Sequence, residues 1–547
     1  MHDILRIDPV TRIEGHLGIE VKVKNGKVVD AWSSGTLFRG IETILIGRDP
    51  ADAPVFTQRS CGVCTYSHLI CSLRAVENAI GVTIPPNARI LRNLLHGAQL
   101  VADHIVHFYH LHALDWVDVI SAISANVKKT AELADSVSNW ERGGVKFYTQ
   151  VQQRLKTFVD SGQLGIFNNA YWGHPAYKLP PEANLMAAAH YIEALRVQTR
   201  AAKMLSIFGG KAPHPDAPVV GGLTCIRDLT PDRIAEFKYM WQYTQEFIEN
   251  VYMPDLLAVA GFYKDWGAIG GTTNFLTWGD FPQTDKEPES FFMPRGVIMD
   301  RDLKNIKTSD PSKVLEHIKH SWYKKGKPKH PAVEETLPEA GEYDRDKKYS
   351  WIKAPRYDGK PCEVGPLARV LVAYAKGHKE IKEAVDNTLK TLDVPVEALF
   401  STLGRTAARA IETVVIGRQM DGWINELLTN IKNGDDKIYQ SWTMPEGTVR
   451  GAGLNDVARG ALGHWIEIEK GKIKNYQYVV PSTWNLGPRC DKGKLGPVEQ
   501  SLIGTPVQDV EKPIEVLRTV HSFDPCLSCA VHVVDYDTNK SCKARIC

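Results

Sequence analysis

The sequence predicts an α+β protein that is predominantly helical and has a β-hairpin near each end of the chain. Apolar residues recur with helical periodicity over residues 87–120, 145–205, 230–262, 365–392 and 395–430. Alternating patterns with turn residues predict hairpins over residues 16–35 and 461–480. A length of 547 residues suggests about three or four domains. Because no linker divides the chain, we expect one compact unit instead.

The two hairpins are predicted from their turns. In the first, Asn25-Gly26 is a type I′ turn signal between the alternating stretch that begins at His16 and Val28-Val29. In the second, Gly471 falls in the turn region. Residues 300–360 are rich in Lys, Asp, Glu and Pro, and we expect them to form a long surface excursion. This excursion is not a disordered linker, because it has aromatic residues to bury, namely Trp322, Tyr343, Tyr349 and Trp351.

Composition excludes several classes of protein. Hydrophobic content is 43% and charged content is 24%, as in an ordinary soluble globular protein. A net charge of +2 gives no reason to expect binding to nucleic acid or to an anionic membrane. The sequence contains no run of eighteen apolar residues, so it predicts no membrane-spanning helix. The first residues, Met1-His-Asp-Ile-Leu-Arg, lack the pattern of a signal peptide, which taken alone predicts the cytoplasm.

Two Cys-x-x-Cys pairs stand at opposite ends of the chain, and each has a histidine three or four residues downstream. In order they are Cys61, Cys64 and His68, then Cys526, Cys529 and His532. Four thiolates can surround one soft metal, such as zinc, an iron–sulfur cluster or copper(I). Spacing alone leaves a structural zinc site or two redox-active disulfides open.

The predicted helix over residues 87–120 is rich in histidine among its leucines and valines. Its polar residues are Asp103, His104, His107, His110 and His112. A haem or a second metal is the alternative interpretation. We favour buried or interface histidines with satisfied hydrogen bonds, because no thiolate or carboxylate clearly completes a ligand set with them.

The residues around both cysteine pairs closely resemble the two metal-binding motifs of the nickel–iron hydrogenase large subunit. Further stretches agree with that family, namely Asp8-Pro-Val-Thr-Arg-Ile-Glu14-Gly-His-Leu, Phe38-Arg-Gly-Ile-Glu42, Glu363-Val-Gly-Pro-Leu-Ala-Arg369, Arg459-Gly-Ala-Leu-Gly-His-Trp465 and Val480-Pro-Ser-Thr-Trp-Asn485. The resemblance covers essentially the whole chain. It implies the fold of that large subunit, with long helices at the core, and heterolytic cleavage of H2.

The resemblance implies a ligand set for two metals. Nickel would be held by Cys61, Cys64, Cys526 and Cys529. Cys64 and Cys529 would also bridge to an iron that carries carbon monoxide and cyanide. Cys526 would take the proton from H2 and Glu14 would pass it outward.

The resemblance also implies the surroundings of the metals. His68 would hydrogen-bond a bridging sulfur, and Arg459 would lie over the site with Asp103 and Asp524. Ser482 and Arg459 would contact the cyanides. A separate magnesium ion would be bound by Glu42, His532 and the backbone carbonyl of Tyr478.

One position departs from the family pattern, and two match residues of its gas channel. Ala458 departs from the family, which usually has proline before this arginine, so the backbone at that position is less restricted. Val63 and Leu111 match residues that narrow the family's gas channel, although plain core packing explains them equally well.

The remaining cysteines match no ligand position of the family. Cys71 is expected to be a small core hydrophobe, and Cys225, Cys362, Cys490, Cys542 and Cys547 to be structural or incidental. No further cysteine cluster is therefore available for iron–sulfur centres, so we expect an iron–sulfur small subunit as partner. In this family many large subunits reach the periplasm through the partner's signal, which is the location we expect.

The resemblance places the mature C-terminus at His532. Residues 1–532 are then the mature subunit, and residues 533–547 are an extension that a nickel-specific protease removes. The leading hypothesis is an enzyme that oxidises or evolves H2. Alternatives are a hydrogen-sensing subunit, which generally lacks such an extension, and a non-catalytic four-cysteine zinc protein. The related quinone-pocket subunit of respiratory complex I lacks both cysteine pairs.

Overall fold

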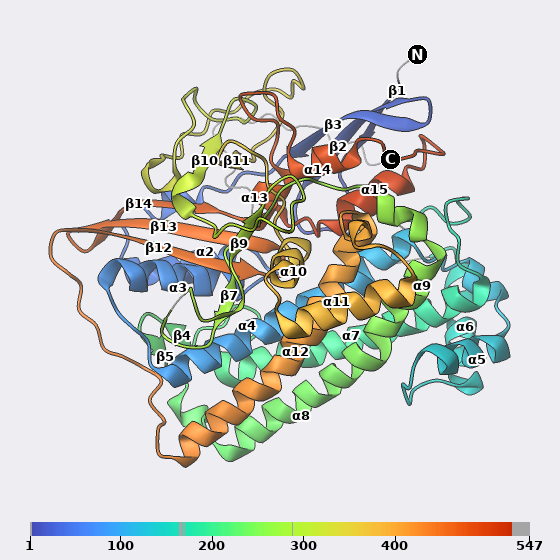
Figure 1. The fold of residues 1–547 in the computed structure, drawn as a ribbon, viewed down its shortest axis with the longest axis horizontal. Coiled ribbons are helices and arrows are strands. Elements are labelled where there is room, and N and C mark those ends of the chain that lie inside the picture. The colour runs from blue at the N-terminus through green and yellow to red at the C-terminus, as the bar shows by residue number, and fades with distance from the viewer. Residues whose placement is uncertain (1–2, 164–166, 168–169, 287, 528–547) are drawn as a thin grey trace.

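Long helices lie side by side through the centre of the molecule (Figure 1). The computed structural model describes residues 3–163, 167, 170–286 and 288–527. The helix α4 (Pro86–Val106) packs between α7 (Pro181–Gly209) and α12 (Thr402–Lys432), and α8 (Pro231–Phe247) packs on α7. The long helices predicted at the core are therefore present.

The central helix α4 is buried along almost its whole length, so its polar residues must find partners inside the protein. A π-helical turn, His107–His112, continues it. His104 and the three histidines of the turn each have such a partner at Nε2, which supports the prediction of hydrogen-bonded histidines. The partners are Glu412 for His104 and the backbone carbonyls of His521, Tyr191 and Arg518 for His107, His110 and His112, respectively.

Two predicted helical stretches are each divided into two helices. Residues 145–205 contain α6 (Val145–Asp160) and α7, which restarts at Pro181, a residue that fits the first turn of a helix. Residues 365–392 contain α10 (Pro366–Ala375) and α11 (Lys379–Leu392). The remaining α-helices are α1 (Ile41–Ile44), α2 (Ala53–Thr57), α3 (Ser67–Ile80), α5 (Val127–Val137), α9 (Met253–Phe262), α13 (Pro481–Leu486), α14 (Pro497–Leu502) and α15 (Ile514–Ser522).

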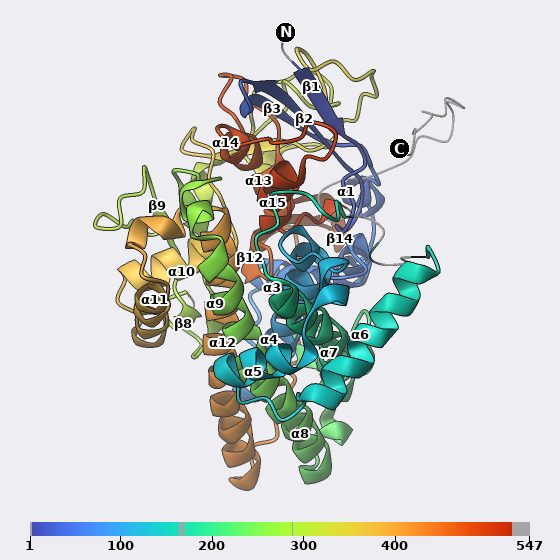
Figure 2. The same cartoon turned by 90° about the vertical axis from the view of Figure 1, so that its right-hand side faces the viewer.

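Both predicted hairpins are observed, each within a three-stranded antiparallel sheet. The first sheet is β1 (Asp3–Ile7), β2 (Leu17–Lys24) and β3 (Lys27–Gly35), and the second is β12 (Thr448–Val457), β13 (Gly460–Glu469) and β14 (Lys472–Val479). Asn25 and Gly26 both have positive φ, as a type I′ turn requires. The first sheet lies at the upper end of the molecule, and α8 and α12 reach its lower end (Figures 1 and 2).

The strand β12 was not predicted, because glycines interrupt its alternating pattern. A Cβ added at Gly451 would lie 2.3 Å from the carbonyl oxygen of Ala75, and one at Gly453 would lie 2.1 Å from that of Cys71. Only glycine allows β12 to pack this closely on α3. The contact joins the sheet to the helix that follows the first cysteine pair.

Residues 300–360 differ in part from the expected surface excursion. Trp322 and Tyr349 are buried, as predicted, but the segment also buries Lys353 and Arg356. Its strands β10 (Val314–His317) and β11 (Ala354–Tyr357) pair with each other. The other short strand pairs are β4 (Pro218–Val219) with β5 (Gly222–Leu223), β6 (Phe275–Thr277) with β9 (Gly296–Ile298), and β7 (Asp280–Pro282) with β8 (Phe291–Met293).

Residues from the first and last parts of the described chain share one hydrophobic core. The largest cluster of buried apolar residues begins at Val10 and ends at Leu527. A parallel bridge pairs Glu14 with Cys526. Within the described part of the chain, none of the helices combines the length and apolar character needed to span a membrane.

Candidate metal centre

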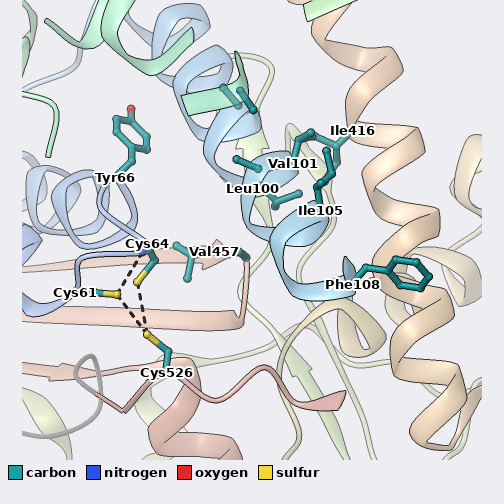
Figure 3. Close-up of a cluster of buried hydrophobic side chains, with 14 of the residues drawn as sticks. Cys61, Cys64, Tyr66, Leu100, Val101, Ile105, Phe108, Ile416, Val457 and Cys526 are labelled. Atoms are coloured by element: carbon teal, nitrogen blue, oxygen red, sulfur yellow. Dashed lines mark hydrogen bonds between the residues drawn. The ribbon is translucent and has the colours of Figure 1, made fainter. Parts of the chain in front are cut away.

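Three cysteines from the two ends of the chain meet in the interior (Figure 3). The sulfur of Cys526 lies 3.4 Å from that of Cys61 and 4.0 Å from that of Cys64. We call these three residues the cysteine cluster; all are buried, and their sulfur atoms lie within 4.8 Å of one another. Cys529 lies outside the described residues. Within the described ranges, no other group of histidine, cysteine and carboxylate side chains gathers this closely.

The first cysteine pair lies on a loop whose backbone is aimed at one sulfur. The N–H groups of Val63 and Cys64 donate to the sulfur of Cys61 at 3.2 and 3.3 Å. Two donors on one sulfur favour its thiolate form, which is the form that binds metals.

Two side chains from outside hold this loop in place. The guanidinium of Arg39 donates to the carbonyls of Ser60 and Arg59 at 2.7 and 2.8 Å. In addition, His214 Nε2 donates to the carbonyl of Cys61 at 3.0 Å. Two side chains therefore hold the loop through its backbone carbonyls.

The second cysteine motif follows a sharp turn after α15. Asp524 has a φ of 54° and redirects the chain towards the N-terminal segment. There Glu14 N–H donates to Pro525 O at 3.3 Å, and Leu527 N–H donates to Glu14 O at 2.7 Å. This pairing places the sulfur of Cys526 at 3.3 Å from Oε2 of Glu14, to which it donates.

The buried cation Arg459 connects two acids next to the cysteine cluster. Its Nη1 donates to Asp103 at 3.2 Å, its Nη2 lies 3.1 Å from Oδ1 of Asp524, and its Nε donates to Asp524 O at 3.2 Å. Burial opposes the charged guanidinium, but the negative charges of Asp524, Cys526 and Asp103 raise the pKa of Arg459 well above its ordinary value. Arg459 therefore stays cationic.

The environment of Asp103 is different, because desolvation dominates there. Burial raises the pKa of Asp103 to about 7, although the charge of Arg459 opposes this change. Gln99 donates to its other oxygen at 2.6 Å. Asp103 is thus held on both oxygens, and its charge depends on its immediate surroundings.

The helix α3 places His68 in the same region. Burial lowers the pKa of His68 to about 4, so its ring is neutral. Its Nδ1 lies 3.1 Å from Nε2 of His464, and one of these two nitrogens donates to the other. His464 in turn lies 2.6 Å from the hydroxyl of Tyr476, which fixes the ring of this second histidine.

A second buried polar centre contains carboxylates instead of thiols. Glu42 accepts from the backbone N–H of Tyr478 at 3.1 Å and from the hydroxyl of Thr336. Burial raises the pKa of Glu42 to about 7, against the opposing charge of Lys353. His532 lies outside the described residues.

Two more acids complete what we call the carboxylate cluster, which is Glu42, Glu316 and Glu334 with Lys353. The ammonium of Lys353 lies 3.2 Å from Glu316 and 3.4 Å from Glu334. All four side chains are buried. With every acid ionised, three negative charges would face one positive charge, an arrangement that a bound divalent cation would balance.

Comparison with known proteins identifies the family. A family model described as nickel-dependent hydrogenase matches residues 39–532, which is most of the chain. The chain belongs to the nickel-dependent hydrogenase family. A second model, described as HoxL-like, matches residues 4–33.

Full-length relatives of this hydrogenase include two named large subunits. The uptake hydrogenase large subunit of Rhizobium leguminosarum bv. viciae is 47% identical over 578 residues, covering 99% of this chain and 97% of the relative. The hydrogenase-2 large chain of Escherichia coli (strain K12) is 44% identical, covering 100% of both.

A solved structure confirms the predicted fold. The nickel–iron–selenium hydrogenase of Desulfovibrio vulgaris Hildenborough in its reduced state superposes with a TM-score of 0.80 at 35% identity, covering 97% of this chain and 100% of that chain. These matches support a catalytic hydrogenase subunit, an oxidoreductase, and they do not favour a four-cysteine zinc protein.

In the structure of the present chain, most of the predicted site residues lie close together. Around the cysteine cluster it places Glu14, Asp103, Arg459, Ser482 and Asp524. Glu42 and the backbone of Tyr478 meet in the carboxylate cluster. The helix α3 brings His68 to the same region, where its Nδ1 contacts His464. Its bond to a bridging sulfur stays a prediction, because Cys529 lies outside the described residues.

Several residues that shape the site were missed in the sequence. They are Arg39, Gln99, His214, Lys353 and His464. Two of them had an available signal, because Arg39 and His464 lie inside stretches that resemble the family. His214 and Lys353 carry no such signal, since each is brought to the site only by the tertiary fold.

Proposed function

We propose that this subunit binds nickel and an iron carrying carbon monoxide and cyanide at the cysteine cluster, and catalyses the reversible heterolytic cleavage of H2. The observation that carries this proposal is the convergence of three buried thiols on a carboxylate, Glu14. Thiol donors suit soft metals such as nickel, so the residues present fit the metals. When bound by these thiolates, the metals would supply the centre that polarises H2.

The proton leaves through two residues of this chain. The thiolate of Cys526 accepts it, and Oε2 of Glu14 lies 3.3 Å away, close to hydrogen-bond distance for transfer from the sulfur. Cys526 is buried whereas Glu14 is partly exposed. A proton that moves from sulfur to carboxylate therefore moves towards the surface.

Arg459 and Ser482 would bind the cyanides. Arg459 presents a buried positive charge next to the thiolates, held by Asp103 and Asp524. Ser482 Oγ accepts from the backbone N–H of Cys526 at 3.1 Å, which leaves its own hydroxyl hydrogen for another acceptor. Both residues thus offer donors where an anionic ligand of the iron would lie.

Magnesium is the cation that we propose for the carboxylate cluster. Glu42, the backbone carbonyl of Tyr478 and His532 would bind it. The support is the excess of buried carboxylates over Lys353, together with their oxygen donors. Binding of a divalent cation would favour the ionised form of Glu42, whose pKa burial raises to about 7.

An iron–sulfur small subunit would receive the electrons. Within the described part of the chain, the other cysteines do not form a cluster with further metal-binding side chains. The segment that leads to the first cysteine pair carries exposed apolar side chains, namely Ile44, Ile46, Val55 and Val63. Exposed apolar residues gathered in one segment are typical of a docking surface, and Val63 lies between the two ligand cysteines.

The periplasm remains the proposed location, with export driven by the partner's signal. Cell fractionation tests this proposal. We expect the subunit in the periplasmic fraction of cells that contain the small subunit, and in the cytoplasm of cells from which the partner's signal is deleted.

Metal analysis with infrared spectroscopy of the purified complex tests the function. We expect about one nickel and one iron in this subunit, in keeping with a single four-thiolate site, and infrared bands from carbon monoxide and cyanide. Stoichiometric zinc without those bands would contradict the proposal. Intact mass spectrometry of active enzyme should also show a chain that ends at His532, without residues 533–547.

A further inference from the structure

The position of Arg459 depends on a very short turn. Ala458 and Arg459 are the two residues that connect β12 to β13, because Val457 pairs with Gly460. Figure 3 shows Val457 at the end of its strand in the same view as the cysteine cluster. Two-residue hairpin turns usually rely on positive φ at their central residues, but neither Ala458 nor Arg459 has it. The conformation of this turn therefore needs support from elsewhere.

A buried arginine on another element supplies that support. Arg369 lies on α10, and its side chain is only 1% exposed. Its Nη1 donates to the carbonyl of Val457 at 2.7 Å, and its Nη2 donates to the carbonyl of Ala458 at 3.1 Å. The guanidinium thus fixes the two peptide groups that immediately precede Arg459.

Arg369 is itself held by buried acids. Glu412 on α12 accepts from Nε at 2.8 Å and from Nη2 at 2.6 Å, and Asp456 accepts from Nη1 at 3.2 Å. His104 on α4 lies 2.5 Å from Glu412. Burial would raise the pKa of Glu412, but Arg369 and His104 lower it to about 2, so this acid is ionised.

The backbone of the turn packs closely against the start of α10. A Cβ added at Gly460 would lie 2.4 Å from the backbone nitrogen of Gly365, just before α10. A Cβ added at Gly365 would lie 3.0 Å from the carbonyl oxygen of Arg459. The start of α10 and the turn are therefore in direct contact, and the guanidinium of Arg369 bonds across this contact.

We propose that Arg369 is a positioning residue for Arg459. By holding the carbonyls of Val457 and Ala458, it sets the direction in which the Arg459 side chain leaves the turn. This inference rests on the proposed function only in that Arg459 lies next to the metals. At Ala458, where the family usually has a proline whose ring restricts φ, the hydrogen bonds from Arg369 would restrict the turn instead.

The test compares Arg369→Lys with a matched control, Arg92→Lys. Arg92 is also buried, forms two hydrogen bonds to Glu77 at 2.8 and 2.7 Å, and donates to two backbone carbonyls, those of Val219 and Gly222. Lysine keeps the charge at either position but cannot reproduce the planar fork. The control therefore has the same kind of buried pair without contact to the Arg459 turn.

The first readout is hydrogen–deuterium exchange of the holoenzyme, followed by mass spectrometry of peptides that contain the turn. Arg369→Lys should accelerate exchange of the Arg459 and Gly460 amides about tenfold or more, since local opening is governed by the hydrogen bonds that hold the segment. Arg92→Lys should leave it unchanged. Unchanged exchange in Arg369→Lys would overturn the proposal, whatever the enzyme's activity.

The second readout is H2 oxidation per bound nickel. Displacement of Arg459 should lower kcat of Arg369→Lys about ten- to a hundredfold, as expected for a misplaced active-site group. Nickel content and KM for H2 should be unchanged, and Arg92→Lys should stay within about twofold of wild type, as expected for a substitution distant from the chemistry. Accelerated exchange with wild-type kcat would also overturn the positioning role.

Rescue distinguishes positioning from general damage. Proline at the first central position of such a turn fixes φ near −65°. Ala458→Pro in the Arg369→Lys background should slow exchange of the turn and restore kcat several-fold, while Ala458→Pro alone should change little. A loss that this second substitution does not restore would contradict the inference.

A second variant tests the same contact if Arg369→Lys fails to incorporate nickel. Glu412→Gln preserves the shape of the buried pair but weakens its hold on Arg369, so it should change exchange and kcat in the same direction and by less. Wild-type values for both in nickel-loaded Glu412→Gln would overturn the proposal. A wild-type enzyme without nickel would instead refute the proposed function, and the exchange measurement would still judge the contact between Arg369 and the turn.

Discussion

The cysteine cluster and the carboxylate cluster solve the problem of buried negative charge in different ways. In the cysteine cluster the sulfur atoms lie within 4.8 Å of one another, and the buried cation Arg459 is held beside them by Asp524. In the carboxylate cluster the cation Lys353 lies among the acids, whose oxygens do not form a comparably close group in the described residues.

This difference matches the chemistry of the metals that we propose for the two clusters. Soft thiolates bind a metal directly and at short range, so the chain must bring their sulfurs together. Magnesium retains several waters and takes few protein ligands, so carboxylates can remain apart around it. Substitutions in the cysteine cluster should therefore affect catalysis most, and substitutions in the carboxylate cluster should affect ion binding and assembly.

The largest effect is expected from Cys526→Ser. A hydroxyl is a poor ligand for a soft metal, so nickel content should fall sharply and H2 turnover should drop more than about a thousandfold. Cys71→Ser is the control, because Cys71 is equally buried but donates to Gly453 O at 3.2 Å, a bond that serine can also form. Nickel-loaded, active Cys526→Ser enzyme would show that this sulfur is not a ligand.

Glu14→Gln should affect proton transfer without affecting the metals. Glutamine cannot carry a proton at neutral pH, so turnover should fall about a hundredfold or more while nickel and iron contents stay constant. The assay is hydrogen–deuterium exchange of H2 alongside metal analysis. Glu20→Gln on β2 is the control, because Glu20 is buried but bonds Tyr343 and Arg345 at a distance from the cysteine cluster. Wild-type exchange in metallated Glu14→Gln enzyme would remove Glu14 from the pathway.

The roles of Cys526 and Glu14 could be predicted because their sequence signals are local. The spacing of the cysteine pairs and the stretches around them identify Cys61, Cys526 and Glu14 without any knowledge of the fold. The hairpins could be predicted for the same reason, since Asn25-Gly26 is both a sequence signal and the observed turn. The helix boundaries at α10 and α11 were less clear, because a single apolar period runs through both.

The supporting residues could not be predicted, because the fold alone selects their partners. Arg369 and Glu412 stand on different helices, and nothing near either residue indicates the other. Lys353 comes from a stretch whose composition indicates a surface segment, yet its ammonium is buried among acids. In each case burial forces a charged group to find a partner, but the identity of that partner depends on long-range packing.

Glu42→Gln should act on the carboxylate cluster and should have a moderate effect. Loss of one carboxylate removes a negative charge that would bind the cation. The affinity for magnesium should therefore fall about tenfold or more. Turnover should fall by a few-fold through poorer assembly rather than through the proton path. Metal analysis after dialysis against a chelator measures this effect, with Glu193→Gln on α7 as control, since Glu193 already pairs with Arg142 and Arg196. Equal magnesium retention in both variants would separate Glu42 from ion binding.

The smallest effect should come from a buried acid outside both clusters, Glu499. It accepts from the backbone N–H of Ser33 and Gly496 and from the hydroxyl of Tyr349. Burial nevertheless raises its pKa to about 7 from an ordinary value of 4.5. In the unfolded chain the acid ionises near its ordinary pKa, whereas in the folded chain it holds its proton up to about pH 7. Stability from this group is therefore fully present below pH 4.5 and is lost as the pH rises towards 7.

Glu499→Gln cannot titrate, so the stability difference between wild type and variant should shift against wild type by about 1–3 kcal/mol between pH 5 and pH 8. Melting temperatures of both proteins at the two pH values measure that shift, and the pH dependence separates it from any constant cost of the amide. Parallel pH profiles would mean that the three donors, rather than burial, determine the charge of Glu499, and hydrogen bonding would then be a sufficient substitute for the cation that the carboxylate cluster requires.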